Sequence, residues 1–419
     1  MDEATRTGCR VEPSFDPLSE TYLEDPFREL AALPHDRAPF YAPVIDYYVV
    51  SRHADIAEVF RDHRTYSAAA AQLPMTTLIP DAAQILAAGG YKPQPTMVSL
   101  DPPAHARLRG PTARAFTPKR VAEMAPTIRG TVSDLLDGLG PTDPFEVVST
   151  LAFPLPATTI FTLLGVPAED YALLKGWCGQ RAGLIWGRPD PAEQVRIAAD
   201  IVSYRSYMHQ LVIAKVDQPG DDLTSDLISI HDEDPEELTL DEIASILFSL
   251  SFAGHETSTC LIANAIRRLL EDPTCWHDLV LDPTLIPNAV EETLRFDSSV
   301  PAWRRVTTRP TSLGGIALPE GAKLFLWLAA AGRDPSVFDL PDKFDLHRRD
   351  ARHRLAFGKG VHFCLGAQLG KLEAELALSE LVRRFPDLHL VEGQTMSFHR
   401  NISFRGPQEL WLKRVPQSQ

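Results

Sequence analysis

The sequence predicts a mostly helical protein with a minor β-sheet, in the α+β class, and three observations lead to this prediction. A helical pattern from Thr239 to about Leu270 is apolar on nearly all sides, which is typical of a helix buried at the centre of a domain. Prolines are frequent, 35 among 419 residues, and their spread along the chain predicts many helices with sharp starts and stops. Only a few short segments alternate like β-strands.

Composition narrows the class of protein. The formal charge of −15 argues against a nucleic acid as general partner, because such partners favour a basic surface. The first residues lack the apolar core of a signal peptide, and no run of about 18 apolar residues predicts a membrane span, so we expect a cytoplasmic protein. The five cysteines, at positions 9, 178, 260, 275 and 364, form no C-x-x-C pair. A disulfide scaffold or a structural zinc site is therefore not expected.

The domain organisation follows from what the chain lacks. Its length alone would fit two or three domains. However, no repeat, low-complexity tract or Gly/Ser-rich linker divides it. We therefore predict an N-terminal arm over residues 1–20 and a single domain over residues 21–419, acting as a monomer.

The first elements are short strands and a helix. Residues 40–41 and 47–50 are predicted strands around a turn, and a helix with one apolar face follows after residue 52. Residues 68–104 form a long irregular connection that contains a short helix over 81–88. Connections of this length are usually functional or disordered.

The later elements are dominated by helices. Residues 107–230 are helical with breaks at prolines, and Thr239 with Glu242 forms a capping-box pattern at the start of the central helix. The remaining predictions are a helix over 287–296, short strands within 305–306, 315–318 and 323–327, a helix over 365–385 and a strand pair in the tail.

The most informative segment is residues 357–366, FGKGVHFCLG, which holds the lone Cys364. Its glycines permit a tight turn and a close approach of a bulky group. Cys364 precedes a predicted helix, whose free N–H groups stabilise a thiolate. One thiolate is a poor zinc or iron–sulfur site but suffices as an axial ligand of haem. The alternative is a buried structural cysteine in a glycine turn.

This segment resembles the cysteine-ligand loop of the cytochrome P-450 family, F-G-x-G-x-H-x-C-x-G, at every specified position. Three more segments resemble family motifs in the same order: AGHET at 253–257, ETLR at 292–295 and FDLHR at 344–348. The resemblance covers roughly residues 22–412. It implies the cytochrome P-450 fold and bound haem b (iron protoporphyrin IX).

The resemblance also assigns roles to individual residues. It implies that Cys364 ligates the iron, that Thr257 hydrogen-bonds dioxygen above the haem, and that Glu256 helps to pass protons. From the residues alone, Glu256 could instead form a structural ion pair and Thr257 could bond a helix carbonyl. The implied haem contacts are His105, Arg109, Arg305, His362, Phe357, Gly358, Gly366 and Ala253.

Two groups of charged residues receive other interpretations. Glu292, Arg295 and Arg348 resemble a buried triad that braces the cysteine loop, which is a structural role. Five bases between Arg107 and Arg120 form either a solvated helix face or a docking patch for an acidic electron donor.

Several segments, including residues 286–292 and 401–407, resemble the haem domains of self-sufficient bacterial cytochromes P-450. Those enzymes carry a fused FMN and iron–sulfur reductase, whereas this sequence lacks the C-x₄-C-x₂-C spacing of a plant-type cluster. We expect electrons from NAD(P)H to arrive through a separate ferredoxin and ferredoxin reductase. The alternative is a fused reductase that is absent from this sequence.

The implied function is a haem-thiolate monooxygenase that inserts one oxygen atom from O₂ into a small organic substrate, by hydroxylation or oxidative dealkylation. A gas sensor, an electron carrier and a peroxide-driven oxygenase are the alternatives, and none of them needs the Glu256–Thr257 pair. The pocket expected from the family topology is almost wholly apolar, which favours an apolar or aromatic substrate. Its expected residues are Met97, Val98, Leu184, Ile185, Ser249, Ala253, Val300, Ala302 and Ile402.

Overall fold

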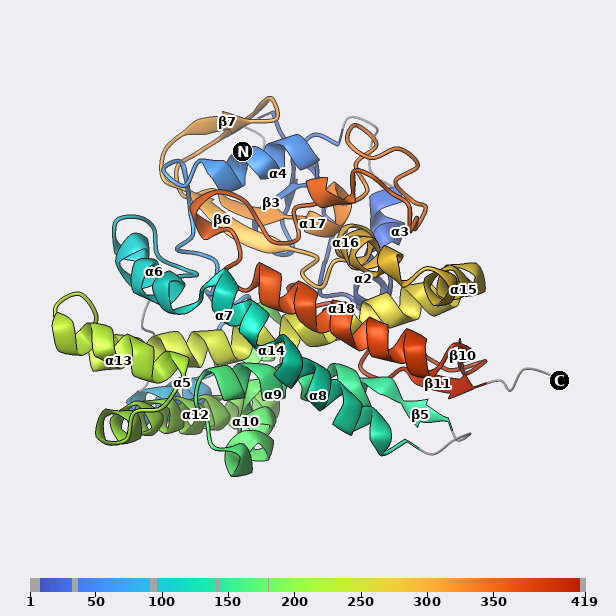
Figure 1. Cartoon of the computed structure of the whole chain (residues 1–419). Helices are drawn as coiled ribbons and strands as arrows, with labels where there is room; N and C mark the ends of the chain where they lie inside the picture. Colours follow the sequence, from blue (N-terminus) through green and yellow to red (C-terminus); the bar gives the residue numbers. More distant parts are fainter. Residues whose placement is uncertain (1–7, 32–36, 91–95, 140–143, 180, 415–419) are drawn as a thin grey trace.

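The computed structural model describes residues 8–31, 37–90, 96–139, 144–179 and 181–414. Helix α14 (Leu240–Glu271) crosses the middle of the molecule, between a part that contains the main sheet and a part built mostly of helices (Figure 1). The predicted capping box is present, because Thr239 and Glu242 each accept a hydrogen bond from the other's backbone N–H. Most side chains of α14 are buried, which confirms the prediction of a central helix.

Long helices cover α14 on several sides. Those packed directly against it are α9 (Pro154–Leu163), α12 (Pro191–Asp217), α13 (Leu223–Glu233), α15 (Pro273–Leu281), α16 (Ile286–Phe296) and α18 (Ala367–Arg384). The other helices are α2 (Glu20–Glu24), α3 (Pro26–Ala31), α4 (His53–Arg61), α5 (Pro80–Ala88), α6 (Ala104–Ala115), α7 (Pro118–Glu123), α8 (Ala125–Asp137), α10 (Tyr171–Cys178), α11 (Arg181–Trp186) and α17 (Leu328–Ala331). Proline occupies one of the first two positions of α5, α7, α9, α12, α15 and α16. There its missing N–H costs no helical hydrogen bond, so these six prolines mark helix starts.

The main sheet has six strands within the described ranges, in the order β1-β2-β3-β9-β6-β4. They are β1 (Arg10–Val11), β2 (Phe40–Ala42), β3 (Tyr47–Val50), β4 (Tyr66–Ser67), β6 (Trp303–Thr307) and β9 (Lys323–Leu326). Strands β5 (Phe145–Glu146), β10 (Leu388–Leu390) and β11 (Trp411–Arg414) form a second sheet, and β7 (Thr311–Leu313) pairs with β8 (Ile316–Leu318). The antiparallel β10–β11 pair is the strand pair predicted in the tail.

Two differences from the predicted elements concern the N-terminal arm and the start of the last helix. From residue 8, the predicted N-terminal arm packs against the domain, because β1 pairs with β2 and Phe15 is buried among aromatic rings. Residues 1–7 lie outside the described part, and the division at residue 20 stays a prediction. The last helix begins at Ala367 rather than at residue 365, because the turn around Cys364 continues to Gly366, the N-cap.

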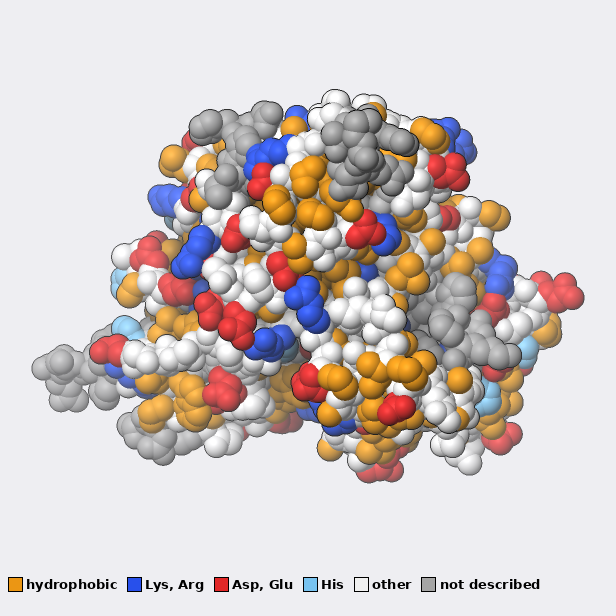
Figure 2. Space-filling model, turned by 180° about the vertical axis from the view of Figure 1, so that it is seen from behind, with side chains coloured by type: hydrophobic (Ala, Val, Ile, Leu, Met, Phe, Trp, Pro, Cys, Tyr) orange, Lys and Arg blue, Asp and Glu red, His pale blue; other side chains and the backbone are white. Residues whose placement is uncertain are grey.

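None of the described helices combines the length and apolar character needed to cross a membrane. On the face opposite to that of Figure 1, acidic and basic side chains are interspersed with apolar ones (Figure 2). The mixture is expected for an acidic chain that still contains 41 lysines and arginines.

Candidate active site

A cavity of about 270 Å³ lies between α14, the segment that follows α16 and the loop before α18. It brings together residues that are far apart in the sequence. Of the haem, oxygen and proton residues expected from the sequence, those lining it are Ala253, Thr257, Arg109, Arg305, Phe357, Gly358, His362, Cys364 and Gly366.

The cysteine loop is shaped by two left-handed glycines. Gly358 and Gly360 have φ of +67° and +70°, a region that other residues rarely adopt. A Cβ atom on Gly360 would also lie 2.6 Å from the carbonyl oxygen of Phe60. The N–H of Cys364 donates to the carbonyl of Phe357 (2.9 Å), which closes the turn.

Cys364 is open to the cavity, although it lies deep in the protein. The loss of bulk water around it raises the pKa of the thiol, while a hydrogen bond from the N–H of Gly366 and the charges of Arg109 and Arg354 lower it. The helix start therefore contributes to thiolate stabilisation, as expected from the sequence.

Arg354, which the sequence analysis missed, connects this loop to α16. Its guanidinium lies 4.5 Å from the ring centroid of Phe357 and forms a 2.6 Å ion pair with Glu291. Glu291 also pairs with Lys371 of α18 at 3.1 Å. Only the neighbouring Glu292 belongs to a recognisable motif, so nothing in the sequence singled out Glu291.

The structure brings Glu292, Arg295 and Arg348 together in the core. Glu292 accepts from Arg295 at 2.7 Å and from Arg348 at 3.0 Å, and all three side chains are buried. Both arginines also donate to backbone carbonyls between residues 332 and 343, among them that of Lys343. These bonds hold the segment between β9 and the cysteine loop, so the triad supports the loop from a distance.

One wall of the cavity is cationic. Arg109 and Arg305 line it, and neither forms an ion pair within the described ranges. Burial is the main cause that lowers the pKa of Arg305 to about 10 and that of His362 to about 3, so His362 is neutral at pH 7. His105 lies behind His362, with ring centroids 4.3 Å apart, and does not line the cavity itself.

These observations test whether the residues fit haem. The buried Nε2 atoms of His105 and His362 have no hydrogen-bond partner within the described part of the chain. His362, which lines the cavity, and the guanidinium groups of Arg109 and Arg305 offer donors to two carboxylates, such as the propionates of haem. A single cysteine lines the same cavity. The donor set therefore fits an iron porphyrin with one thiolate ligand.

Thr257 and Glu256 differ in position. Thr257 lines the cavity, and its hydroxyl donates to the carbonyl of Ala253 at 2.9 Å, the helix bond considered as an alternative. Glu256 does not line the cavity, because successive helical residues point about 100° apart. Its buried carboxyl lies 3.5 Å from Nδ1 of His255.

Burial raises the pKa of Glu256 to about 7 and lowers that of His255 to about 3. Near pH 6 both groups are therefore mainly neutral, and their close contact is not an ion pair. The alternative of a structural ion pair for Glu256 finds no support here. A buried acid with a pKa near 7 can both hold and release a proton at physiological pH.

Glu373 of α18 is a further buried acid that the sequence analysis missed. It lines the cavity, and burial raises its pKa to about 8 despite the nearby hydroxyls of Ser258 and Thr159. At pH 7 this carboxyl is mainly protonated, so it adds no full negative charge to the cavity wall.

The residues predicted for the substrate pocket differ in their position relative to this cavity. Met97, Val98, Ser249, Ala253 and Val300 line the cavity. Leu184, Ile185, Ala302 and Ile402 are not among the residues that line it. These four side chains are buried, and the next or next-but-one residue lines the cavity instead. The residues that line the cavity in their place are Trp186, Trp303 and Phe404.

Together with Phe252, these three rings form an aromatic wall. Trp186 lies 5.3 to 6.0 Å, between ring centroids, from each of the other three. Trp303 is the first residue of β6 and lines the cavity, whereas Ala302 precedes the strand and does not. Ile402 instead donates its backbone N–H to the carbonyl of Trp186.

The basic run after residue 106 is not a free patch. Arg107 pairs with Glu242, Arg114 with Glu237 and Lys119 with Glu123, while Arg120 pairs with Asp221 and Asp226. The docking interpretation of this run loses its support, because acids on the chain itself offset these charges.

Comparisons with known proteins agree with this geometry. Residues 276–405 match the family model for cytochrome P450. The chain is 35% identical over 353 residues to the erythromycin C-12 hydroxylase of Saccharopolyspora erythraea, covering 84% of this chain and 85% of that protein. The structure of cytochrome P450 CREJ in complex with (4-ethylphenyl) dihydrogen phosphate matches with a TM-score of 0.92 and 36% identity, over 96% of this chain and 99% of that one.

An intact type IV self-sufficient cytochrome P450 monooxygenase also matches, with a TM-score of 0.92 and 34% identity, over 96% of this chain and 53% of that one. This confirms the resemblance to self-sufficient haem domains. Fold and relatives thus define a bacterial haem-containing monooxygenase, an oxidoreductase. The chain belongs to the cytochrome P450 family.

Proposed function

We propose that Cys364 is the axial thiolate ligand of haem b, and that Arg109, Arg305 and His362 bind its propionates. The single observation that carries this is the cavity that Cys364 shares with two arginines lacking ion-pair partners among the described residues. His105 holds the ring of His362 from behind. When bound, haem supplies the activation of O₂ for insertion of one oxygen atom into the substrate.

Absorption spectroscopy tests this proposal. The reduced, CO-bound holoenzyme is expected to show the red-shifted Soret band of thiolate ligation. Cys364→His is expected to bind haem without that band. If the band persists in this variant, another residue is the ligand and the proposal is wrong.

The protein's part in the reaction is to position the substrate and control protons. Thr257, at the cavity wall, presents a hydroxyl that can hand a proton inward, and Glu256 behind it holds a proton at its carboxyl near pH 7. Such a relay favours a monooxygenase over a gas sensor, an electron carrier or a peroxide-driven oxygenase. Product formation that depends on both O₂ and a reductant distinguishes the monooxygenase from all three.

For the substrate we infer an apolar, preferably aromatic, small molecule, undergoing hydroxylation or oxidative dealkylation. The wall of Trp186, Phe252, Trp303 and Phe404 supports this, because aromatic rings pack well in offset or edge-to-face contacts. The ligand named for the CREJ structure also contains a phenyl ring.

Electrons are proposed to come from NAD(P)H through a ferredoxin and its reductase, or through a fused reductase like that of the self-sufficient relatives. The surface around the cysteine loop, and not the expected run of bases from Arg107 to Arg120, supports docking of the electron donor. Phe363, beside Cys364, is 45% exposed. Arg61 and Lys359 flank the loop, and the charge of Arg61 lowers the pKa of Lys359 further than burial alone does. This apolar and cationic surface suits an acidic protein.

A further inference from the structure

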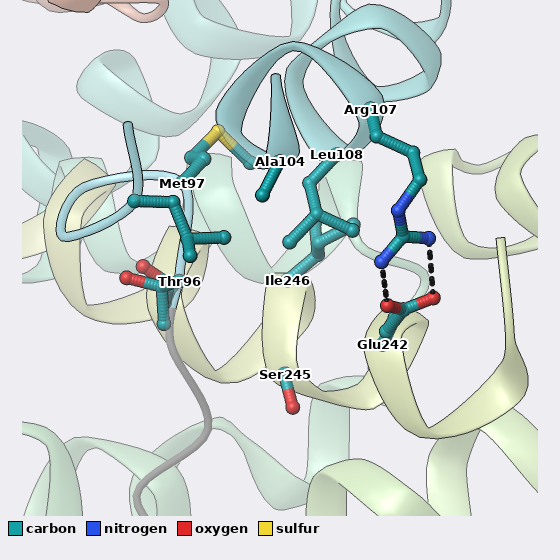
Figure 3. Close-up of a pocket in the computed structure, with 10 residues that line it drawn as sticks. Thr96, Met97, Ala104, Arg107, Leu108, Glu242, Ser245 and Ile246 are labelled. Carbon is teal, nitrogen blue, oxygen red and sulfur yellow. Dashed lines mark hydrogen bonds and ion pairs between the residues drawn. The ribbon is translucent and has the colours of Figure 1, made fainter. Parts of the chain in front are cut away.

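A second cavity, of about 150 Å³, lies beside the active-site cavity, between α6 and the first half of α14 (Figure 3). Met97 and Ser249 line both cavities, so the two cavities adjoin at these side chains, which are called the partition below. The rest of the wall of this side cavity is formed by Thr96, Leu100, Ala104, Arg107, Leu108, Glu242, Ser245 and Ile246.

An ion pair lies at the end of the side cavity opposite Met97 (Figure 3). Nη1 of Arg107 donates to Oε2 of Glu242 at 3.0 Å, and Nη2 donates to Oε1 (Figure 3). The two side chains are 43% and 25% exposed, whereas Met97 and Ser249 are buried. The pair therefore lies where the cavity meets solvent.

The two halves of this pair differ in how firmly they are held. Glu242 is fixed by the capping box, since its Oε2 also accepts from the N–H and the hydroxyl of Thr239, each at 3.0 Å. Arg107 is tied otherwise by one bond to the carbonyl of Glu237 at 3.2 Å. Opening would thus require Arg107 to swing away. At the inner end, Met97 is an unbranched side chain that changes rotamer readily.

We propose that the side cavity is a second route for ligands into the active-site cavity, and that the Arg107–Glu242 pair is its outer gate. The route suits uncharged, largely apolar molecules. Its walls are formed mainly by Leu100, Leu108 and Ile246 with a few hydroxyls, and the charges at its mouth neutralise each other. This inference rests on the proposed function, because the ligand must reach the haem.

Ligand-binding kinetics of the holoenzyme test the gate. Stopped-flow mixing with 4-phenylimidazole, an uncharged apolar ligand of haem iron, reports arrival through the Soret shift. Glu242→Gln keeps a side chain that can complete the capping box but removes the charge, and Arg107→Gln removes the other half. Both variants are expected to raise the association and dissociation rates about fivefold, because an exposed ion pair contributes only a small free energy to keeping the gate shut. Kd should stay nearly unchanged.

The matched control is Arg114→Gln. Arg114 pairs with Glu237 on the same side of the molecule, is also exposed, and does not line the side cavity. Its rates are expected to equal those of the unmodified enzyme. Because salt screens an exposed pair, raising the ionic strength should speed binding in the unmodified enzyme and in Arg114→Gln, but not in Glu242→Gln.

A second variant tests the route itself. Ile246→Trp fills the side cavity from a position that does not line the active-site cavity, and it should slow association in the Glu242→Gln background. The proposal is overturned if both gate variants bind at the control's rate, or if they change Kd while the rates move in opposite directions. If the reduced, CO-bound holoenzyme lacks the red-shifted Soret band, the proposed function is contradicted. That outcome is distinct from a failure of the gate.

Discussion

The guanidinium of Arg354 forms a 2.6 Å ion pair with the carboxylate of Glu291, and the same guanidinium lies over the ring of Phe357. The side chains of the two charged residues are only 9% and 5% exposed. The pair thus joins α16 to the first residue of the cysteine loop, a role that the Glu292 triad fulfils only indirectly.

Removing one partner of this pair should therefore weaken the loop. Glu291→Gln leaves the Arg354 charge buried without a carboxylate, and we expect a loss of about 3 kcal/mol in the free energy of unfolding. Urea unfolding measures it, and haem content should fall in parallel. The control is Glu123→Gln, in the exposed Lys119–Glu123 pair, where a change within about 0.5 kcal/mol is expected. Equal losses would show that the buried pair has no special role.

Thr257→Ala is expected to uncouple the reaction. Reductant should still be consumed, but with several-fold more hydrogen peroxide per product, because the hydroxyl at the cavity wall is lost. Thr259→Ala is the matched control, since Thr259 makes the same kind of bond to a helix carbonyl but does not line the cavity. If both variants uncouple equally, the helix bond and not the cavity hydroxyl is responsible.

The raised pKa of Glu256 predicts a pH dependence of stability. The folded carboxyl has a pKa of about 7, whereas an unfolded one ionises near 4.5, so between these values the folded state binds more protons. Stability should therefore fall by about 3 kcal/mol as pH rises from 4.5 to 7. The Glu256→Gln variant should lack this pH-dependent part of the free energy of unfolding. The part that comes from Glu373 is the same in both proteins. Urea unfolding at pH 5 and pH 8 checks this, and a pH-independent difference between the proteins would contradict it.

Reversing charge at the loop surface should slow electron transfer. Arg61→Glu or Lys359→Glu is expected to lower the association rate with an acidic ferredoxin about tenfold at low salt, with haem content unchanged. Arg114→Gln should have little effect, because Arg114 is already paired. Stopped-flow reduction at several ionic strengths gives these rates. If the association rate changes in the Arg114 variant but not in the Lys359 variant, the ferredoxin docks on the bases between Arg107 and Arg120 instead.

Phe404 lines the cavity and Ile402, two residues before it, does not, so variants of the two residues can be compared directly. Phe404→Leu should weaken binding of an aromatic probe, 4-methoxytoluene, at least about threefold, because a ring is lost from the wall. Ile402→Val should leave binding unchanged and cost about 1 kcal/mol of stability. Spectral titration and urea unfolding separate the two effects. Equal changes in binding would mean that Ile402 faces the ligand after all.

The sequence by itself determined the central helix, the cysteine loop and the family. A capping box and a long apolar pattern are local in the chain, so Thr239 and Glu242 could be interpreted without a fold. The same holds for the glycines around Cys364, because a left-handed turn is a property of a few neighbouring residues.

Only the tertiary structure decided which side chains meet. It placed Trp186, Trp303 and Phe404 at the cavity wall, one or two residues beyond the predicted Leu184, Ile185, Ala302 and Ile402, because a small shift along the chain turns a different side chain toward the cavity. It also paired Arg107, Arg114 and Arg120 with acids more than 100 residues distant and Lys119 with the nearby Glu123. Long-range pairing of charges leaves no local pattern, and the Arg354–Glu291 pair was missed for the same physical reason.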